Sequence, residues 1–429
     1  MSIVQKLLKN KLVNNFIVLI SGDAFVSVLN IISTAIIINA IGLEQNGMIL
    51  MIQTYALFFD QAFNFKSFQA LIKYLSITLH NKDIKNTKSY INQSLFLDFI
   101  TAMIATIVGF ICLDFVINLM GWNPSIKIYI TIYLITIIFN LSGTCIGILR
   151  IFNKYNYITY INVSAGVFRF LLFLIGLIGK LNFTYFLATE ICYSIMKNLL
   201  YMIFSYKVLR ENSLQDFYKF KLKLDKSFFM FNLYSNITLT IDLPVGTLTT
   251  FIINKYLGFE MISIYKIFEK IGSLLGRLSE PLNQIIYPEL NNLVSRNDKN
   301  SAKKLVRNLV LGIGGFGLCI MIFMVLTYKL WLGIFIPNYE VYILSLIIYM
   351  MFIIFVNVTS SVHSLFLALG YIKYSFPIVL VINIVYSIII VPIVKIYMLN
   401  GVILVLFLQS VMVILAKLVV MKKIKVPII

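Results

Sequence analysis

A stripe of polar and charged side chains runs along one long apolar segment, from Ile262 to Ile286. On a helix of 3.6 residues per turn these side chains fall within about 80° of arc. They are Lys266, Lys270, Ser273, Arg277, Glu280 and Gln284. A cation at the centre of a bilayer costs roughly 2.5 to 3.5 kcal/mol on insertion scales, which disfavours a stripe that faces lipid. We therefore expect it to line water inside a helix bundle, in a lumen suited to an anionic substrate.

The individual cations of the stripe have alternative interpretations. Lys266 lies near one end of the segment, where its side chain could instead snorkel to the membrane interface. Lys270 and Arg277 lie deeper, and we expect them to contact an anion, because cations outnumber acids on that face. The alternative for these two is a structural ion pair with Glu269 or Glu280.

Acidic residues occur at membrane depth in other apolar segments. Asp23 and Asp242 each share a helical face with Ser, Thr or Asn side chains. Intramembrane carboxylates commonly serve proton relays, so both are candidates for ion coupling, with an ion pair or a hydrogen bond inside the bundle as the alternative. Asp60 is a third acid, without an obvious partner in its segment, and it is a further candidate for ion coupling or gating, as is Glu280 of the stripe.

Two further cations have acids at a similar depth in a neighbouring segment. Lys66 is expected beside Asp98, and Arg169 is expected beside Glu190. We interpret each couple as a structural ion pair, although such pairs also gate cavities. The structural role is the preferred interpretation. The alternatives are anion binding by Lys66 and Arg169 and gating by Glu190.

The sequence shows no sign of catalysis or of a metal centre. The four cysteines each stand alone in an apolar run, and His363 has no Cys or His neighbour. No nucleophile occurs with a base at a recognisable spacing. We expect no enzyme, no cofactor and no bound metal.

These residues must be positioned by membrane helices. The chain has 429 residues, of which 60% are hydrophobic and only 12% charged, and its mean hydropathy is +0.92. About twelve apolar segments approach the 20 residues that span the hydrocarbon core as a helix. The expected segments are 13–41, 48–74, 91–120, 128–149, 157–178, 183–204, 228–253, 262–286, 305–326, 341–369, 376–396 and 402–420. The chain is therefore predicted to be an all-α polytopic membrane protein.

The formal net charge of +19 reports topology and not affinity for nucleic acid. Lys and Arg concentrate before the first segment, in every even-numbered loop and after the last segment, whereas the other loops carry isolated lysines. Basic loops stay in the cytoplasm. We expect both termini there and a multi-pass protein with no nucleic-acid partner.

Short motifs recur half a chain apart. Gly42 and Gly258 lie in similar turns at a separation of 216 residues, and Asp23 and Asp242 are separated by 219. An even number of crossings in each half preserves the orientation of the repeat. We expect two six-helix bundles, 1–205 and 228–429, related by a pseudo-twofold axis along the membrane normal and joined by a basic cytoplasmic linker, 206–227.

Several stretches together resemble the polysaccharide-export and O-antigen unit flippase branch of the multidrug/oligosaccharidyl-lipid/polysaccharide (MOP) superfamily. They are the turn 41–47, the helix end Gly147–Tyr155, and the run from Asp242 through Leu257-Gly258 and Tyr287-Pro288 to Asn297-Asp298. The chain departs from the family pattern after Asp60 and at Ser263, where glycine is frequent. These departures leave the expected fold in place and bear on the ion-coupling or gating role of Asp60.

The resemblance implies a MATE-like fold in a bacterial inner membrane. It implies a flippase that moves a polyprenyl-diphosphate-linked oligosaccharide, for O antigen or a related surface polysaccharide, from the cytoplasmic to the periplasmic leaflet by alternating access through a cationic central cavity. Membrane lipids and a polysaccharide polymerase would be its other partners. Arg277, Lys270, Lys66 and Arg169 would then receive the diphosphate.

Two other functions compete with this one. A cation-coupled multidrug exporter has the same architecture, but a lumen for organic cations should be acidic, against the excess of Lys and Arg on 262–286. A membrane enzyme of polysaccharide assembly, such as a polymerase or a glycosyltransferase, would need an external loop large enough to hold catalytic groups. The predicted outer loops are short, so the enzyme is the less favoured of the two.

Overall fold

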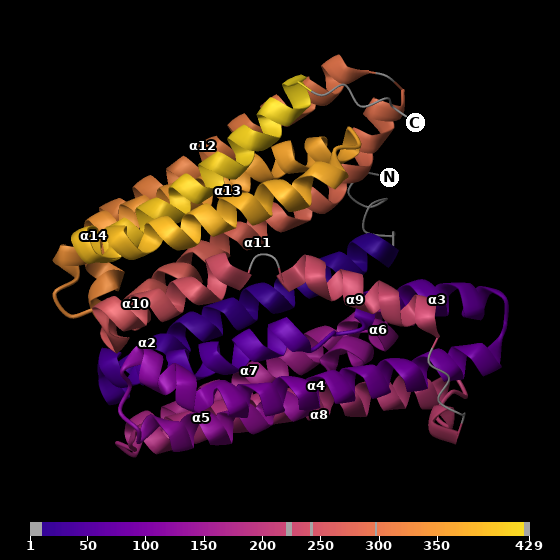
Figure 1. The fold of residues 1–429 in the computed structure, drawn as a ribbon, viewed down its shortest axis with the longest axis horizontal. Helices are drawn as coiled ribbons and strands as arrows, with labels where there is room; N and C mark the ends of the chain where they lie inside the picture. Colours follow the sequence, from indigo (N-terminus) through magenta and orange to yellow (C-terminus); the bar gives the residue numbers. More distant parts are fainter. Residues whose placement is uncertain (1–10, 220–224, 241–242, 297, 424–429) are drawn as a thin grey trace. The chain divides into compact units, whose positions relative to one another are not determined.

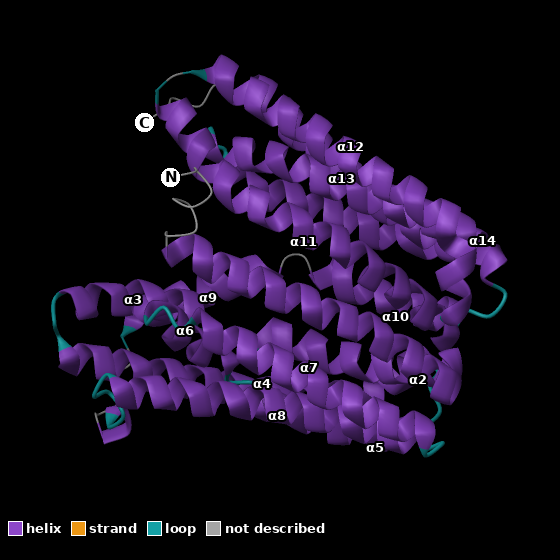
Figure 2. Ribbon diagram, turned by 180° about the vertical axis from the view of Figure 1, so that it is seen from behind, coloured by secondary structure: helices purple, strands orange, loops and turns teal. Residues whose placement is uncertain are grey.

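The computed structural model describes the backbone of residues 11–219, 225–240, 243–296 and 298–423. These residues form helices joined by short loops, and no strand occurs within the ranges just given (Figure 2). The helices, labelled as in Figure 1, are α2 (Lys11–Phe63), α3 (Phe68–His80), α4 (Ile84–Met120), α5 (Ile126–Leu134), η1 (Ile135–Phe139), α6 (Ser142–Ile151), α7 (Tyr155–Ile178), α8 (Phe183–Glu211), η2 (Phe217–Lys219), α9 (Lys226–Thr240), η3 (Pro244–Leu248), α10 (Thr249–Leu257), α11 (Phe259–Ser295), α12 (Lys299–Trp331), η4 (Leu332–Ile334), η5 (Tyr339–Tyr342), α13 (Ile343–Ala368) and α14 (Ile372–Lys423).

The all-α polytopic fold is confirmed. In lipid every backbone N–H and C=O must be satisfied within the chain, which a helix achieves along its whole length. Helices α2 and α14 each contain two consecutive crossings, because the backbone leaves helical geometry at Gly42 and at Met398. Seven helical stretches among the described residues are long and apolar enough on their own to cross a membrane. Helix α11 is not one of them, because the charges of its stripe interrupt the apolar run.

The chain divides by its contacts into two compact units. Unit 1 consists of residues 1–41 and 48–243, and unit 2 of residues 42–47 and 244–429. The short segment 42–47 from the first half of the sequence therefore belongs to unit 2, while helix α9 from the second half belongs to unit 1. The sequence-based boundary at residue 228 describes the internal repeat, and it stays a prediction.

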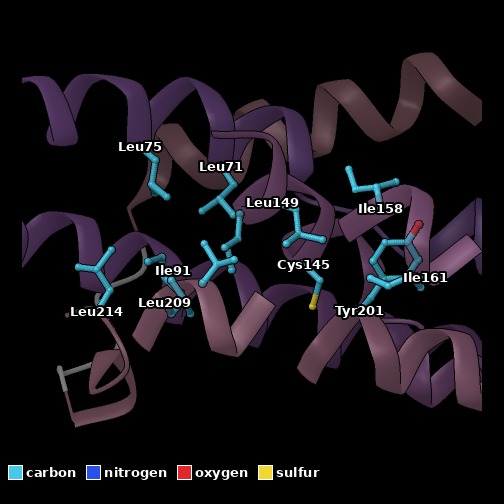
Figure 3. Packing of buried hydrophobic residues seen from close by; sticks show 12 residues of the cluster. Leu71, Leu75, Ile91, Cys145, Leu149, Ile158, Ile161, Tyr201, Leu209 and Leu214 are labelled. Atoms are coloured by element: carbon cyan, nitrogen blue, oxygen red, sulfur yellow. The ribbon is translucent and has the colours of Figure 1, made fainter. Parts of the chain in front are cut away.

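Unit 1 is held together by an apolar core between its helices. Figure 3 shows Leu71 and Leu75 of α3 facing Cys145 and Leu149 of α6, with side chains of α4, α7 and α8 around them. All twelve residues of this core are at most 7% exposed. This packing fixes α3 and α6, the two helices that begin at the site described below.

Helix α9 joins unit 1 through its first turn. Phe228 is fully buried against Ala70 of α3 and Leu97 of α4. Just before the helix, Asp225 accepts a hydrogen bond from Tyr90 Oη at 3.1 Å. Hydrogen bonding from the hydroxyl of Ser227 lowers the pKa of Asp225, so this carboxylate stays charged where the linker meets the bundle.

Unit 2 is built around α13. Helices α11, α12 and α14 all pack against it, and α12, α13 and α14 run side by side along their lengths (Figure 1). Leu290 of α11, Val306 of α12 and Leu365 of α13 form one of its buried clusters. The contacts with α13 hold α11 in place within unit 2.

The repeat in the sequence has a counterpart in the backbone. Gly42 has φ 82° and ψ 169°, and Gly258, 216 residues later, has φ 89° and ψ −179°. Only glycine adopts this region readily, since a Cβ would clash with the backbone. The turn at Gly42 is fixed within unit 2, where Asn46 Nδ2 donates to Ser263 Oγ at 2.9 Å and Ser263 Oγ donates to the Leu43 carbonyl at 2.6 Å.

Candidate functional site

Two membrane-depth helices of unit 1 are broken, and their breaks touch. The first break separates the end of α2 at Phe63 from the start of α3, and the second separates the end of η1 at Phe139 from the start of α6. Lys66, in the first break, has φ 45°. A Cβ added at Gly143 would lie 2.5 Å from Lys66 Cα, so the two breaks pack at a distance that only glycine permits.

Asp98 of α4 binds the starts of both following helices. Its carboxylate accepts the Ser67 N–H at 2.9 Å, the Thr144 N–H at 2.8 Å and the Thr144 hydroxyl at 2.7 Å. The side chain is completely buried. Free N–H groups and the helix dipole make a helix start positive, so one carboxylate compensates two helix starts at once.

Asp60 of α2 lies at the other side of the breaks, near the two helix ends. It accepts the Asn64 amide at 2.9 Å and the Asn140 amide at 3.0 and 2.9 Å, and it forms an ion pair with Lys66 at 2.8 Å. The Asp60 side chain is 6% exposed, whereas that of Lys66 is 30% exposed. The Lys66 cation thus lies where the carbonyl ends of two half-helices favour positive charge.

The broken segments are further tied to their surroundings by polar contacts. Asn64 Nδ2 also donates to the Asn140 carbonyl at 3.1 Å, and Asn236 of α9 donates to the Asn64 carbonyl at 3.1 Å. The carbonyls freed by the breaks therefore receive side-chain donors, as buried backbone groups require. We call Asp60, Asn64, Lys66, Asp98 and Asn140 the broken-helix cluster.

The expected pairing of Lys66 with Asp98 was wrong. Lys66 pairs with Asp60, six residues earlier, and Asp98 is used by backbone N–H groups. The sequence-based segment 48–74 assumed one continuous helix, in which residues 60 and 66 lie on different faces. The break after Phe63 brings them together. The breaks carry a weak sequence signal that was missed, because Asn64 and Asn140 each precede a Ser by two or three residues at a helix start.

The expected pairing of Arg169 with Glu190 is confirmed. Arg169 Nε donates to Glu190 Oε1 at 2.9 Å, Nη2 contacts the same oxygen, and Nη1 donates to Asn30 Oδ1 at 3.0 Å. The guanidinium also lies over the rings of Phe173 and Tyr193. Helices α2, α7 and α8 are joined by this one side chain, and its role toward a substrate stays a prediction.

Of the other candidates in unit 1, Asp23 is exposed on α2. Its expected companions on the same face have separate roles. Thr34 Oγ1 donates to the Asn30 carbonyl four residues earlier at 2.7 Å, and the Asn30 side chain binds Arg169. The ion-coupling role of Asp23 stays a prediction.

The charged stripe of α11 is described over its first half. Lys266 Nζ forms an ion pair with Glu269 of the same helix at 2.6 Å, and it lies over the ring of Tyr265. Lys270 is partly buried. Asp242 and the side chains of Arg277 and Glu280 lie outside the described residues, so their assignments stay predictions.

A buried contact between two basic side chains was not foreseen. Lys417 of α14, 5% exposed, lies with its Nζ 3.1 Å from His363 Nδ1 of α13. An ammonium can only donate, so this imidazole nitrogen accepts and the ring is neutral. No spacing in the sequence links two residues on different helices in this way. For metals, the described part of the chain contains no group of three or more His, Cys, Asp or Glu placed to hold an ion.

Known proteins share this fold. The chain matches no known protein-family model. It is 20% identical to the inner membrane protein YghQ of Escherichia coli strain K12 over 327 residues, which cover 73% of this chain and 91% of YghQ.

Solved structures agree over nearly the whole chain. An inward-facing multidrug resistance MATE family transporter of the MOP superfamily superimposes with a TM-score of 0.70 at 12% identity, covering 92% of this chain and 93% of the transporter. The lipid II flippase MurJ in an inward closed conformation gives a TM-score of 0.69 at 14% identity, covering 95% and 88%. The fold of this chain is therefore the MATE-like fold of two helical bundles.

Proposed function

We propose that this protein is a flippase of the bacterial inner membrane for a polyprenyl-diphosphate-linked oligosaccharide, as used for O antigen or a related surface polysaccharide. The substrate's diphosphate and sugars cannot cross hydrocarbon unaided, whereas its lipid tail can remain in the bilayer. The protein would carry the head group from the cytoplasmic to the periplasmic leaflet by alternating access. Substrate or a coupling ion must then bind the two states with different affinity.

The observation that carries this proposal is the cationic stripe of α11 within a MATE-like fold. Lys266, which pairs with Glu269, and Lys270 both lie on α11, and Arg277 continues the stripe in the sequence. Cations on such a helix favour a phosphate-bearing substrate over an organic cation. The likeness to MurJ, which is described as a lipid II flippase, supports a lipid-linked substrate of this kind.

Reconstitution into vesicles tests the proposal. A fluorescent undecaprenyl-diphosphate-linked oligosaccharide, placed on both leaflets, should become fully accessible to an external quencher when the protein is present. Lys270→Ala and Arg277→Ala should each slow this exchange at least tenfold, because a charge-assisted contact to phosphate is lost. Lys329→Ala, which removes an exposed lysine at the end of α12, should exchange like the unaltered protein.

Unchanged exchange in both stripe variants would contradict the role of α11. Exchange equal to that of protein-free vesicles would contradict the flippase itself. In cells, loss of the gene should remove the surface polysaccharide while its lipid-linked unit accumulates on the cytoplasmic side.

A multidrug exporter is the second candidate, because the MATE transporters share the fold as fully as the flippase does. It predicts energy-dependent efflux of an organic cation such as ethidium from cells that produce the protein. Such efflux, together with normal surface polysaccharide in the deletion strain, would replace the flippase proposal. An enzyme of polysaccharide assembly would instead have to form or break a glycosidic bond in the vesicle assay.

A further inference from the structure

The buried Asp60 carboxylate accepts N–H donors from Asn64 and Asn140 and already holds one monovalent cation, the Lys66 ammonium. The Asp60 carboxylate, at 6% exposure, is contacted by two side-chain amides and the ammonium. Helices α2 and η1 both end beside it, at Phe63 and Phe139. Unwound backbone and the carbonyl ends of half-helices are the elements with which membrane transporters hold small cations at mid-membrane.

Lys66 is able to leave this place. It lies in the break between α2 and α3, outside either helix, and its side chain is 30% exposed, five times the value for Asp60. A lysine ammonium is a compact charge on a flexible four-carbon stem, and it pairs strongly with phosphate oxygens. An anionic head group that reaches the exposed side of Lys66 therefore competes with Asp60 for the same ammonium.

Departure of Lys66 would leave a carboxylate in a buried site with neutral amides alone. An uncompensated buried charge is strongly unfavourable, so the carboxylate must gain a new counter-charge. The nearby charged group of the cluster, Asp98, is itself an acid and is fully engaged with two helix starts. Within the broken-helix cluster no cation other than Lys66 is available, so the counter-charge is taken from solution, as a metal cation or as a proton.

We propose that Asp60 is a cation-exchange site, at which a monovalent metal cation replaces the Lys66 ammonium when Lys66 binds an anionic head group. The identity of that head group rests on the proposed function, but the exchange at Asp60 does not. Anion and cation would then bind with positive and reciprocal coupling. Each anion would enter with one cation, which ties substrate binding to a cation gradient.

Removing the tethered ammonium isolates the cation site. In purified full-length protein we would compare Lys66→Asn and Lys66→Met with the unaltered chain. Asparagine tolerates the positive φ of this position, and methionine keeps the length of the side chain. The midpoint of thermal unfolding is followed as sodium chloride replaces choline chloride at constant ionic strength. Lys73→Asn is the matched control, because Lys73 on α3 lies over the ring of Phe231, 4.4 Å from its centre, and not beside Asp60.

Both Lys66 variants should gain stability with sodium, by about 3 °C at about 100 times the dissociation constant. The double variant Asp60→Asn/Lys66→Asn should not respond. The unaltered chain and the Lys73 variant should respond to sodium only when inorganic diphosphate is also present.

Three results would overturn the exchange. One is indifference of both Lys66 variants to sodium, and another is a sodium response that survives in the double variant. The third is stabilisation of the Lys66 variants by lower pH and not by sodium, which would show that a proton neutralises Asp60. The measurement uses no lipid-linked oligosaccharide, so its outcome is separate from that of the vesicle assay.

Discussion

Asp98 binds the backbone N–H of Ser67 at 2.9 Å, while the adjacent residue, Lys66, gives its ammonium to Asp60. Two neighbouring residues in one helix break thus bind two different carboxylates, one through a backbone N–H and the other through an ammonium. Asp98 accepts hydrogen bonds from two helix starts, whereas Asp60 pairs with the cation that we propose to be exchangeable. The predictions below separate the structural part of the broken-helix cluster from the exchangeable part.

Replacing Asp98 by alanine should destabilise the protein by about 3 kcal/mol or more. Two buried N–H groups and one hydroxyl would lose their acceptor. Asp98→Asn should cost less, because an amide oxygen still accepts. Thermal unfolding in detergent measures both. Asp114→Ala is the control, since Asp114 is 68% exposed and its ion pair with Lys127 lies at the surface; equal losses for Asp98 and Asp114 would contradict this role.

Gly143→Ala should prevent the two breaks from packing. The new Cβ would lie 2.5 Å from Lys66 Cα, and backbone on both sides leaves nothing free to move aside. We expect a marked loss of folded protein, measured by the monodisperse fraction in size-exclusion chromatography. Gly312→Ala, in the middle of α12 with no atom within 4 Å of the new Cβ, should be neutral or stabilising. A tolerated alanine at 143 would mean that the breaks can separate without cost.

Arg169 and Glu190 should be strongly coupled in a double-mutant cycle. Arg169→Met leaves a buried acid that is 5% exposed, and Glu190→Gln leaves a buried guanidinium. Each single change should cost about 3 kcal/mol or more, whereas the double change should cost clearly less than their sum. Midpoints of chemical unfolding for the four proteins give the coupling energy. Additive losses would show that the pair contributes nothing beyond its separate contacts.

Alanine at Gly42 and at Gly258 should have nearly equal effects. Both positions use the same glycine-only backbone, and neither offers an atom within 4 Å of a new Cβ, so the cost is one of backbone strain alone. We expect about 1 to 3 kcal/mol for each change. Gly315→Ala, in open space on a helix, is the control. A large effect at one position only would argue against structural equivalence of the two turns.

The sequence predicts the architecture well because lipid leaves few options. Apolar runs of membrane length must be helices, and the described parts of the expected segments are largely helical. The main exceptions are the breaks after Phe63 and Phe139, which interrupt the expected segments 48–74 and 128–149. The pairing of Arg169 with Glu190 was also predictable, because it joins consecutive helices at equal depth. The partner of Lys66 was not, because hydropathy does not record where a helix breaks. Neither was the contact of Lys417 with His363, which depends on how α13 and α14 rotate against each other.

The exchange of short segments between the two units has a consequence for a cleaved chain. Residues 42–47 are part of unit 2, and α9 is part of unit 1. A protease that cuts after Lys219 would leave each fragment holding a piece of the opposite bundle: Asn46 would remain hydrogen-bonded to Ser263 across the cut, and Phe228 would remain beneath Ala70. The two fragments should therefore co-purify as one particle. The protein should then stay assembled without an intact peptide chain after α8.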